Sequence, residues 1–108
     1  MHTSIIDTTD NTFTDNIINN KGLTLVMFWA PWCGHCTRMM PTVEKLVQTY
    51  ASQLTVCRIN IEENSKTADA FEVNGTPTFI LFKNGDVLDE LIGESPLQEL
   101  EQFIDKHL

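Results

Sequence analysis

Basic residues, cysteines and long hydrophobic runs are all scarce in this sequence. Seven Lys and Arg stand against fifteen Asp and Glu among 108 residues, which gives a formal net charge of −8. Proteins that bind nucleic acids or anionic membranes carry clustered cations, so this balance argues against both classes of partner. The longest apolar stretch, from Leu23 to Trp32, is far too short to cross a bilayer.

Only three cysteines are present, and only two of them lie close together in the sequence. An odd count with one close pair is not the pattern of a secreted disulfide framework. The first twenty residues contain no basic segment followed by an apolar one, so we expect no signal peptide and a reducing, cytoplasmic location. With 108 residues, 42% of them hydrophobic, the chain is expected to form one domain over residues 1–108.

Apolar and amphipathic segments alternate along the chain. Strands are expected at residues 5–6, 23–30, 54–61, 78–82 and 86–92. Helices are expected between the capping residues 9–11 and residue 21, at 33–50, at 65–71 and from residue 95 onward. The segment 23–30 is almost continuously apolar, which is typical of a central strand in a mostly parallel sheet. The order β-α-β-α-β-α-β-β-α predicts an α/β fold, with helices on both faces of a mixed central sheet.

The spacing of apolar residues predicts which helical faces are buried. The first helix should bury Phe13, Ile17 and Ile18. The long second helix, kinked by Pro41, should bury Cys36, Met40, Val43, Val47 and Tyr50. The last helix should bury Leu97, Leu100 and Ile104.

Two local signals predict how the C-terminal elements are connected. Asn84-Gly85 can adopt the positive φ angles of a type I′ turn, so the last two strands should form an antiparallel hairpin. Ser95 should cap the last helix, with Pro96 at its first position and Gln98 completing a capping box.

Cys33 and Cys36 lie where the central strand should end and the long helix begin. Free N–H groups and the dipole at a helix N-terminus stabilise an anion, so we expect a lowered pKa and a nucleophilic thiolate at Cys33. Cys36, one turn further on, is spaced to close a disulfide and to act as the resolving thiol. The pair therefore predicts thiol–disulfide exchange through a mixed disulfide.

Other uses of the cysteines are less consistent with the sequence. A structural zinc site needs four ligands, whereas Cys57 is single and His2 and His107 lie at the chain ends, so we expect no metal. A purely structural disulfide is disfavoured in a reducing compartment. Cys57 is expected to be a small buried hydrophobic residue on the third strand, with a regulatory or glutathionylated thiol as the alternative.

The segment Trp29-Ala30-Pro31-Trp32-Cys33-Gly34-His35-Cys36 closely resembles the active-site segment of the thioredoxin family. Residues 74–78, 82–85 and 92–93 resemble further motifs of that family, in the same order, so the resemblance spans nearly the whole chain. It implies a thioredoxin fold and a protein-disulfide oxidoreductase active in cell redox homeostasis, with no bound cofactor. Electrons would come from a thioredoxin reductase that draws on NADPH. We expect a monomer that acts on protein disulfides.

The resemblance also implies roles for particular residues. Pro77 should follow a cis peptide bond and face the dithiol, where its ring would keep metal away from the thiols. The backbone of Thr76 should pair with the substrate chain. Trp29 should pack beneath the dithiol loop. A shallow apolar substrate groove should be lined by Trp32, Gly75, Thr76, Pro77, Ile92 and Gly93.

The dipeptide between the cysteines departs from the family pattern. Ordinary thioredoxins carry Gly-Pro, whereas Gly34-His35 resembles protein disulfide isomerase. A cationic His beside a thiolate favours the reduced form, so the disulfide should be a stronger oxidant than that of an ordinary thioredoxin. The alternative is an exposed His35 without a redox effect.

The buried acid that the family carries below the dithiol is also absent. The matching position is Met27, and the basic residue usually near that acid is matched by Arg58. We therefore expect Cys36 to lose its proton to water or His35, with slower resolution at neutral pH. This absence also gives weight to one alternative function, a thioredoxin-fold binding module with incidental thiols. A disulfide isomerase or oxidase-type partner protein is a further alternative.

Overall fold

The computed structural model describes residues 4–108, so His2 lies outside the described residues. The strands are β1 (Ile6–Thr8), β2 (Leu23–Trp29), β3 (Leu54–Asn60), β4 (Thr78–Lys83) and β5 (Asp86–Ile92). The helices are η1 (Thr14–Ile18, a π-helical turn), α1 (Gly34–Thr49), α2 (Ser65–Ala70) and α3 (Leu97–Asp105). The element order is the predicted one.

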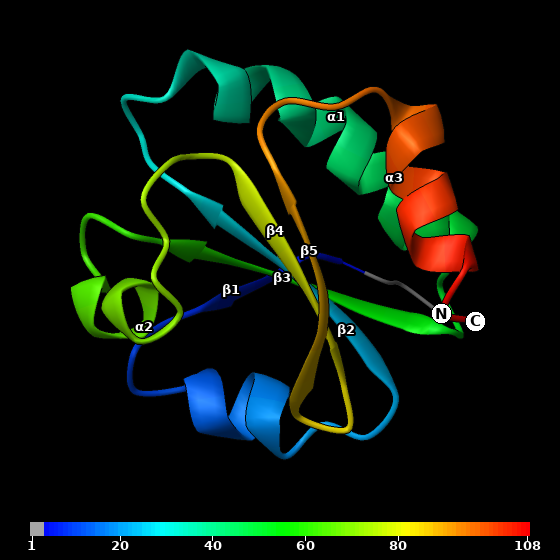
Figure 1. Cartoon of the computed structure of the whole chain (residues 1–108), viewed down its shortest axis with the longest axis horizontal. Coiled ribbons are helices and arrows are strands. Elements are labelled where there is room, and N and C mark those ends of the chain that lie inside the picture. The colour runs from blue at the N-terminus through cyan, green and yellow to red at the C-terminus, as the bar shows by residue number, and fades with distance from the viewer. Residues whose placement is uncertain (1–3) are drawn as a thin grey trace.

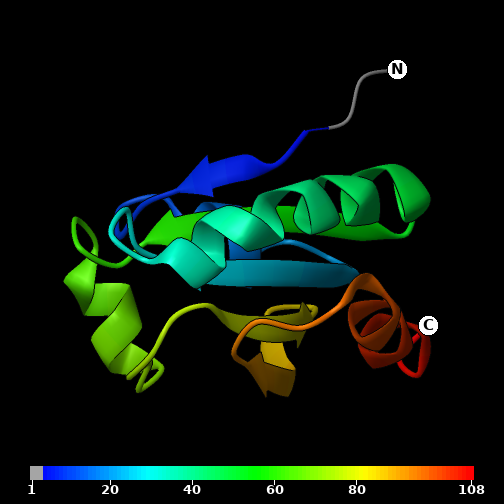
Figure 2. The ribbon, with the colours of Figure 1, turned by 90° about the horizontal axis from the view of Figure 1, so that it is seen from above.

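The five strands form one mixed sheet in the order β1-β3-β2-β4-β5 (Figures 1 and 2). β3 is parallel to both β1 and β2, whereas β4 is antiparallel to both β2 and β5. β2 is therefore central, as predicted, but only one of its two neighbouring strands, β3, runs parallel to it. The hairpin is also confirmed, because Asn84 and Gly85 have φ angles of 51° and 85°.

Both faces of β2 are covered, which explains its almost continuous apolar sequence. Leu23, Leu25 and Met27 belong to a buried cluster with residues of α1 and α3. Val26 and Phe28 belong to a second buried cluster, on the side of η1. Figure 1 shows the same division, with α1 and α3 on one side of the sheet and α2 on the other. α1 begins shortly after β2 ends and packs on the sheet through the first of these clusters, so the start of α1 lies at the end of the central strand.

The buried face of α1 differs slightly from the prediction. Met39 and Leu46 are fully buried together with Cys36, Val43 and Val47, whereas Met40 is only half-buried. Both Met39 and Met40 lie within one helical turn of Cys36 and of Val43, so the spacing alone allows either of them on the buried face. The packing of α1 against the sheet buries Met39 and leaves Met40 at the edge of the stripe.

The first helix forms only one π-helical turn, and two predictions for it are wrong. Ile18 is 38% exposed, whereas Phe13 and Ile17 are buried. The i→i+5 bond from Asn19 to Thr14 winds this turn more widely than an α-helix, which moves Ile18 off the buried face. Asp10 does not cap this helix but α2, because its carboxylate accepts the backbone N–H of Thr67 at 2.9 Å.

The start of the last helix is also different. Pro96 occupies the capping position of α3, and no side chain makes a capping hydrogen bond there. Ser95 precedes the cap, and its hydroxyl donates to the carbonyl of Gly93 at 3.4 Å. The predicted capping box is therefore wrong, because the cap lies one residue later than Ser95. Leu100 and Ile104 are fully buried as predicted, and Leu97 is half-buried.

Candidate active site

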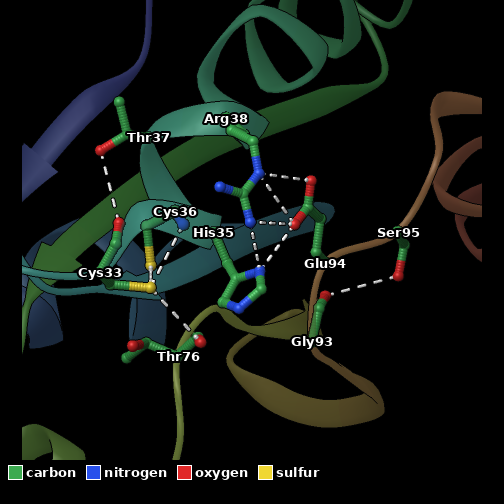
Figure 3. Close-up of polar contacts among 9 residues, drawn as sticks. All are labelled: Cys33, His35, Cys36, Thr37, Arg38, Thr76, Gly93, Glu94 and Ser95. Atoms are coloured by element: carbon green, nitrogen blue, oxygen red, sulfur yellow. Dashed lines mark hydrogen bonds and ion pairs between the residues drawn. The ribbon is translucent and has the colours of Figure 1, made fainter.

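The two cysteines lie at the junction of β2 and α1. Cys33 is the N-cap residue of α1, with extended backbone angles, and its sulfur accepts the backbone N–H of Cys36 at 3.2 Å. The Cys36 thiol donates to the Cys33 sulfur over 2.7 Å (Figure 3). All three cysteines of the chain are free thiols in this structure. The pair is thus poised for disulfide closure, which needs only a short approach of the two sulfurs.

The surroundings make the two thiols chemically unequal. Burial by itself raises the pKa of Cys33, but hydrogen bonds from the side chains of Cys36 and Thr76 and from the backbone N–H groups of Cys36 and His35 outweigh it, and the pKa is lowered. Burial, together with the neighbouring Cys33, raises the pKa of Cys36. Cys36 is also only 1% exposed. A thiolate therefore forms more readily on Cys33 than on Cys36, in agreement with the sequence.

A second loop faces the cysteines from the start of β4. The Thr76–Pro77 peptide bond is cis, as the family resemblance implies. The Cys33 thiol donates to the backbone carbonyl of Thr76 over 3.5 Å. Thr78 closes this loop with a hydrogen bond from its hydroxyl to the carbonyl of Gly75 at 2.7 Å.

A third segment, at the end of β5, is joined to that loop. The backbone N–H of Gly93 donates to the carbonyl of Pro77 at 2.8 Å. The preceding Ile92 is 66% exposed, and Trp32, beside Cys33, is 68% exposed. The predicted groove residues thus come from three segments far apart in the sequence, and two of them present large apolar side chains to solvent.

His35 has partners that the sequence did not suggest. Its Nδ1 lies 2.7 Å from a carboxylate oxygen of Glu94 and 2.7 Å from Nη2 of Arg38 (Figure 3). The effect of His35 on the redox potential stays a prediction. The sequence alone indicated no role for Arg38 or Glu94. The spacing of His35 and Arg38 by three residues on one helix could have indicated their contact, but nothing local connects them to Glu94.

Met27 is completely buried in the cluster that also contains Cys36. Its neighbours in the sheet are Arg58 on β3 and Phe79 on β4. The position below the dithiol is therefore an apolar one in this chain.

Arg58 is directed toward the first strand and Trp29. Its guanidinium forms an ion pair with Asp7 and lies 5.3 Å from the centre of the Trp29 ring. It also lies 3.7 Å from the sulfur of Met40. Trp29 packs against the cluster that contains both active-site cysteines. A redox effect of Arg58 stays a prediction, and it would have to act through these neighbours.

Cys57 lies on β3 and is completely buried, as predicted. Burial raises its pKa to about 11. A protonated thiol without solvent contact is a poor nucleophile, so this cysteine belongs to the hydrophobic core.

The described residues include neither a candidate metal site nor a candidate membrane-spanning helix. Within residues 4–108, no three His, Cys, Asp or Glu side chains are grouped so that they could hold a metal ion. Over the same part of the chain, none of the helices has the length and apolar character needed to span a membrane.

Comparison with known proteins agrees with this geometry. The model of the thioredoxin family matches residues 4–106. Thioredoxin of Staphylococcus saprophyticus is 40% identical over 105 residues, covering 97% of this chain and 99% of that protein. Thioredoxin 1 of Nostoc sp. is 36% identical over 100 residues, covering 93% of this chain and 94% of that protein. The chain therefore belongs to the thioredoxin family and is a protein thiol–disulfide oxidoreductase.

Proposed function

We propose that Cys33 is the attacking thiol and Cys36 the resolving thiol in the reduction or exchange of disulfides in other proteins. The asymmetry of the pair carries this proposal. The Cys33 sulfur accepts an N–H at the helix start, and its pKa is lowered. Cys36 is almost fully buried, and its pKa is raised. The more acidic and less enclosed thiol is the better attacker.

The two steps balance as an exchange of two electrons. The Cys33 thiolate attacks one sulfur of the substrate disulfide, that bond breaks, and the other substrate sulfur leaves as a thiolate that takes a proton from solvent. Cys36 then loses its proton and attacks the Cys33 sulfur of the mixed disulfide. The second substrate sulfur leaves as a thiol, and the two oxidised sulfurs remain joined as the Cys33–Cys36 disulfide. The substrate has gained two electrons and the dithiol has lost them.

The substrate would dock on the apolar rim beside the dithiol. Trp32 and Ile92 expose large apolar surfaces there, and such surface is typical of a binding site. The Thr76 backbone carbonyl lies within hydrogen-bonding distance of the Cys33 sulfur. A substrate chain could therefore pair with the Thr76 backbone along the edge formed by Gly75, Pro77 and Gly93, while its disulfide meets Cys33.

Recycling of the oxidised pair needs an electron donor. We infer that a thioredoxin reductase using NADPH fills this role, as the family membership suggests, and that this chain itself works as a monomer without a bound cofactor. A reducing compartment such as the cytoplasm suits the reaction, because protein thiols are kept reduced there.

The test is the reduction of insulin by the purified protein with NADPH and a thioredoxin reductase. Cys33→Ser should abolish turnover, and Cys36→Ser should retain the first attack and accumulate a mixed disulfide with insulin. Cys57→Ser, which removes a thiol outside the site, should keep wild-type turnover. Equal rates for the wild type and Cys33→Ser would contradict the proposal. If a partner protein still bound the variant lacking both active-site thiols while insulin reduction was absent from the wild type, a binding module would be the correct function.

A further inference from the structure

A cluster of polar side chains lies beside the dithiol, and two of its members, Arg38 and Glu94, have no part in the two exchange steps. His35 and Arg38 extend from the first turn of α1, and Glu94 extends from the segment between β5 and α3 (Figure 3). Nη2 of Arg38 lies 3.0 Å from Oε1 of Glu94, and Nε of Arg38 lies 3.3 Å from both carboxylate oxygens. These contacts form a two-pronged ion pair that also reaches the imidazole of His35.

The Arg38 side chain folds back over the loop between the two cysteines. A Cβ atom added to Gly34 would lie 3.6 Å from Nη1 of Arg38, in ordinary van der Waals contact. The guanidinium therefore lies close to the loop that carries Cys33. The attraction between Arg38 and a Cys33 thiolate also contributes to a raised pKa of the guanidinium, after the larger effect of Glu94. A cation held at this place stabilises the thiolate.

Glu94 opposes that cation. Hydrogen bonds from Arg38 and then His35 lower the pKa of the Glu94 carboxyl group to about 2, so Glu94 is negatively charged at neutral pH. Its negative charge is paired with the positive charge of Arg38 and therefore reduces the effect of that cation on the dithiol. The imidazole Nδ1 of His35 can donate to Glu94 or accept from Arg38, but it cannot do both at once. The net charge of the cluster therefore depends on the Arg38–Glu94 pair and not on His35 alone.

We propose that Arg38 and Glu94 are positioning residues that set the net charge beside Cys33 and thereby the reduction potential of the dithiol. This inference rests on the proposed function, because it concerns the same two thiols. In the equilibrium with glutathione, the dithiol and one oxidised glutathione give the protein disulfide and two reduced glutathiones, with two electrons transferred. Positive charge near Cys33 stabilises its thiolate, favours the reduced protein and lowers the equilibrium constant for oxidation.

The two residues should shift this equilibrium constant in opposite directions. Arg38→Gln removes the cation and should raise the constant, which makes the protein more reducing. Glu94→Gln removes the opposing carboxylate and should lower it. Exposed charge pairs interact weakly, so we expect changes of about two- to fivefold. The double variant restores the balance of charge and should return close to the wild-type value.

The experiment measures the fraction of oxidised protein at pH 7 over a series of glutathione ratios. Matched controls are Lys45→Gln, an exposed cation later on the same helix, and Glu99→Gln, an exposed carboxylate on α3. Neither control should move the constant. The proposal is overturned if Arg38→Gln and Glu94→Gln shift the constant in the same direction, or no further than the controls. Insulin reduction by the wild type is measured in parallel. If the wild type reduces insulin but the equilibrium constants of the Arg38 and Glu94 variants equal that of the wild type, only this inference is rejected. If the wild type does not reduce insulin, the proposed function is rejected.

Discussion

The substitution Met27→Asp places a carboxyl group where this chain has a completely buried thioether. Met27 is surrounded by the apolar cluster between the sheet and α1, and Phe79 lies beside it on β4. A carboxyl group enclosed in this way is desolvated when it ionises, which raises its pKa in the folded protein. The variant is therefore expected to lose stability as the pH rises.

The magnitude follows from that desolvation. Full burial raises the pKa of an aspartate carboxyl group by about 3 units or more above its usual value of about 3.9. At about 1.4 kcal/mol per unit, this amounts to about 4 kcal/mol. Because the pKa in the folded state lies above that in the unfolded state, the variant is most stable below pH 4. It loses stability as the pH rises through the folded pKa and changes little beyond it.

The assay compares urea unfolding of Met27→Asp and Met27→Asn between pH 4 and pH 8. The amide variant has nearly the same shape but does not titrate, so it measures the cost of lost packing and of burying an uncharged polar group. The difference between the two variants should grow by about 4 kcal/mol across this range. A difference that does not change with pH would refute the reasoning. It would mean that the carboxylate stays ionised at low cost, for instance by pairing with the neighbouring Arg58.

The same substitution tests proton removal from Cys36. The pKa of Cys36 is raised by its burial, so a nearby carboxylate could accept its proton during resolution. We expect Met27→Asp to speed the release of a preformed mixed disulfide at pH 7 by about tenfold, somewhat below the usual contribution of a general base. Met27→Asn should show no gain. Unchanged turnover and an unchanged pH profile would show that water or His35 already accepts this proton efficiently.

Two further predictions concern stability. Gly85→Ala should cost about 1–3 kcal/mol more than Gly22→Ala in urea unfolding, because both glycines have positive φ but only a Cβ on Gly85 would overlap the carbonyl oxygen of Ile18. Equal losses would show that the backbone of the hairpin adjusts freely. Asp89 accepts a hydrogen bond from His107, and its pKa is lowered to about 2. The stability that it contributes, about 1 kcal/mol for a partly exposed pair, is present above pH 4 and lost as the pH falls toward 2. Asp89→Asn should therefore lower stability at pH 7 and not at pH 2, and an equal loss at both values would contradict this assignment.

Several parts of this protein could be predicted because their causes are local in the sequence. The run of apolar residues in β2 indicates a strand that is covered on both faces, and its two faces contribute to the two buried clusters. Asn84 and Gly85 adopt positive φ angles, which asparagine tolerates and which glycine adopts freely because it has no Cβ atom. Cys33 and Cys36 lie one turn apart at the start of a helix, so their proximity follows from helix geometry, whereas burial of Cys36 and the contact of Cys33 with Thr76 add to the difference between their pKa values. The chemistry of the site was therefore predictable from eight consecutive residues and the elements around them.

The partners of single polar side chains were decided only by the tertiary structure. Asp10 is an equally good cap for the helix that follows it, yet it binds the N–H of Thr67, which lies 57 residues further along the chain. Glu94 lies 59 residues from His35 in the sequence, yet its carboxylate contacts the Nδ1 atom of His35, which Arg38 also contacts. Hydrogen bonds and ion pairs form between polar groups that the packed sheet and helices bring within about 3 Å of each other. The local sequence around a residue does not predict which distant groups will lie that close to it. The sequence by itself thus determined the reactive dithiol and the fold that presents it, whereas the charges that surround the dithiol were assembled only when β5 and α1 came together.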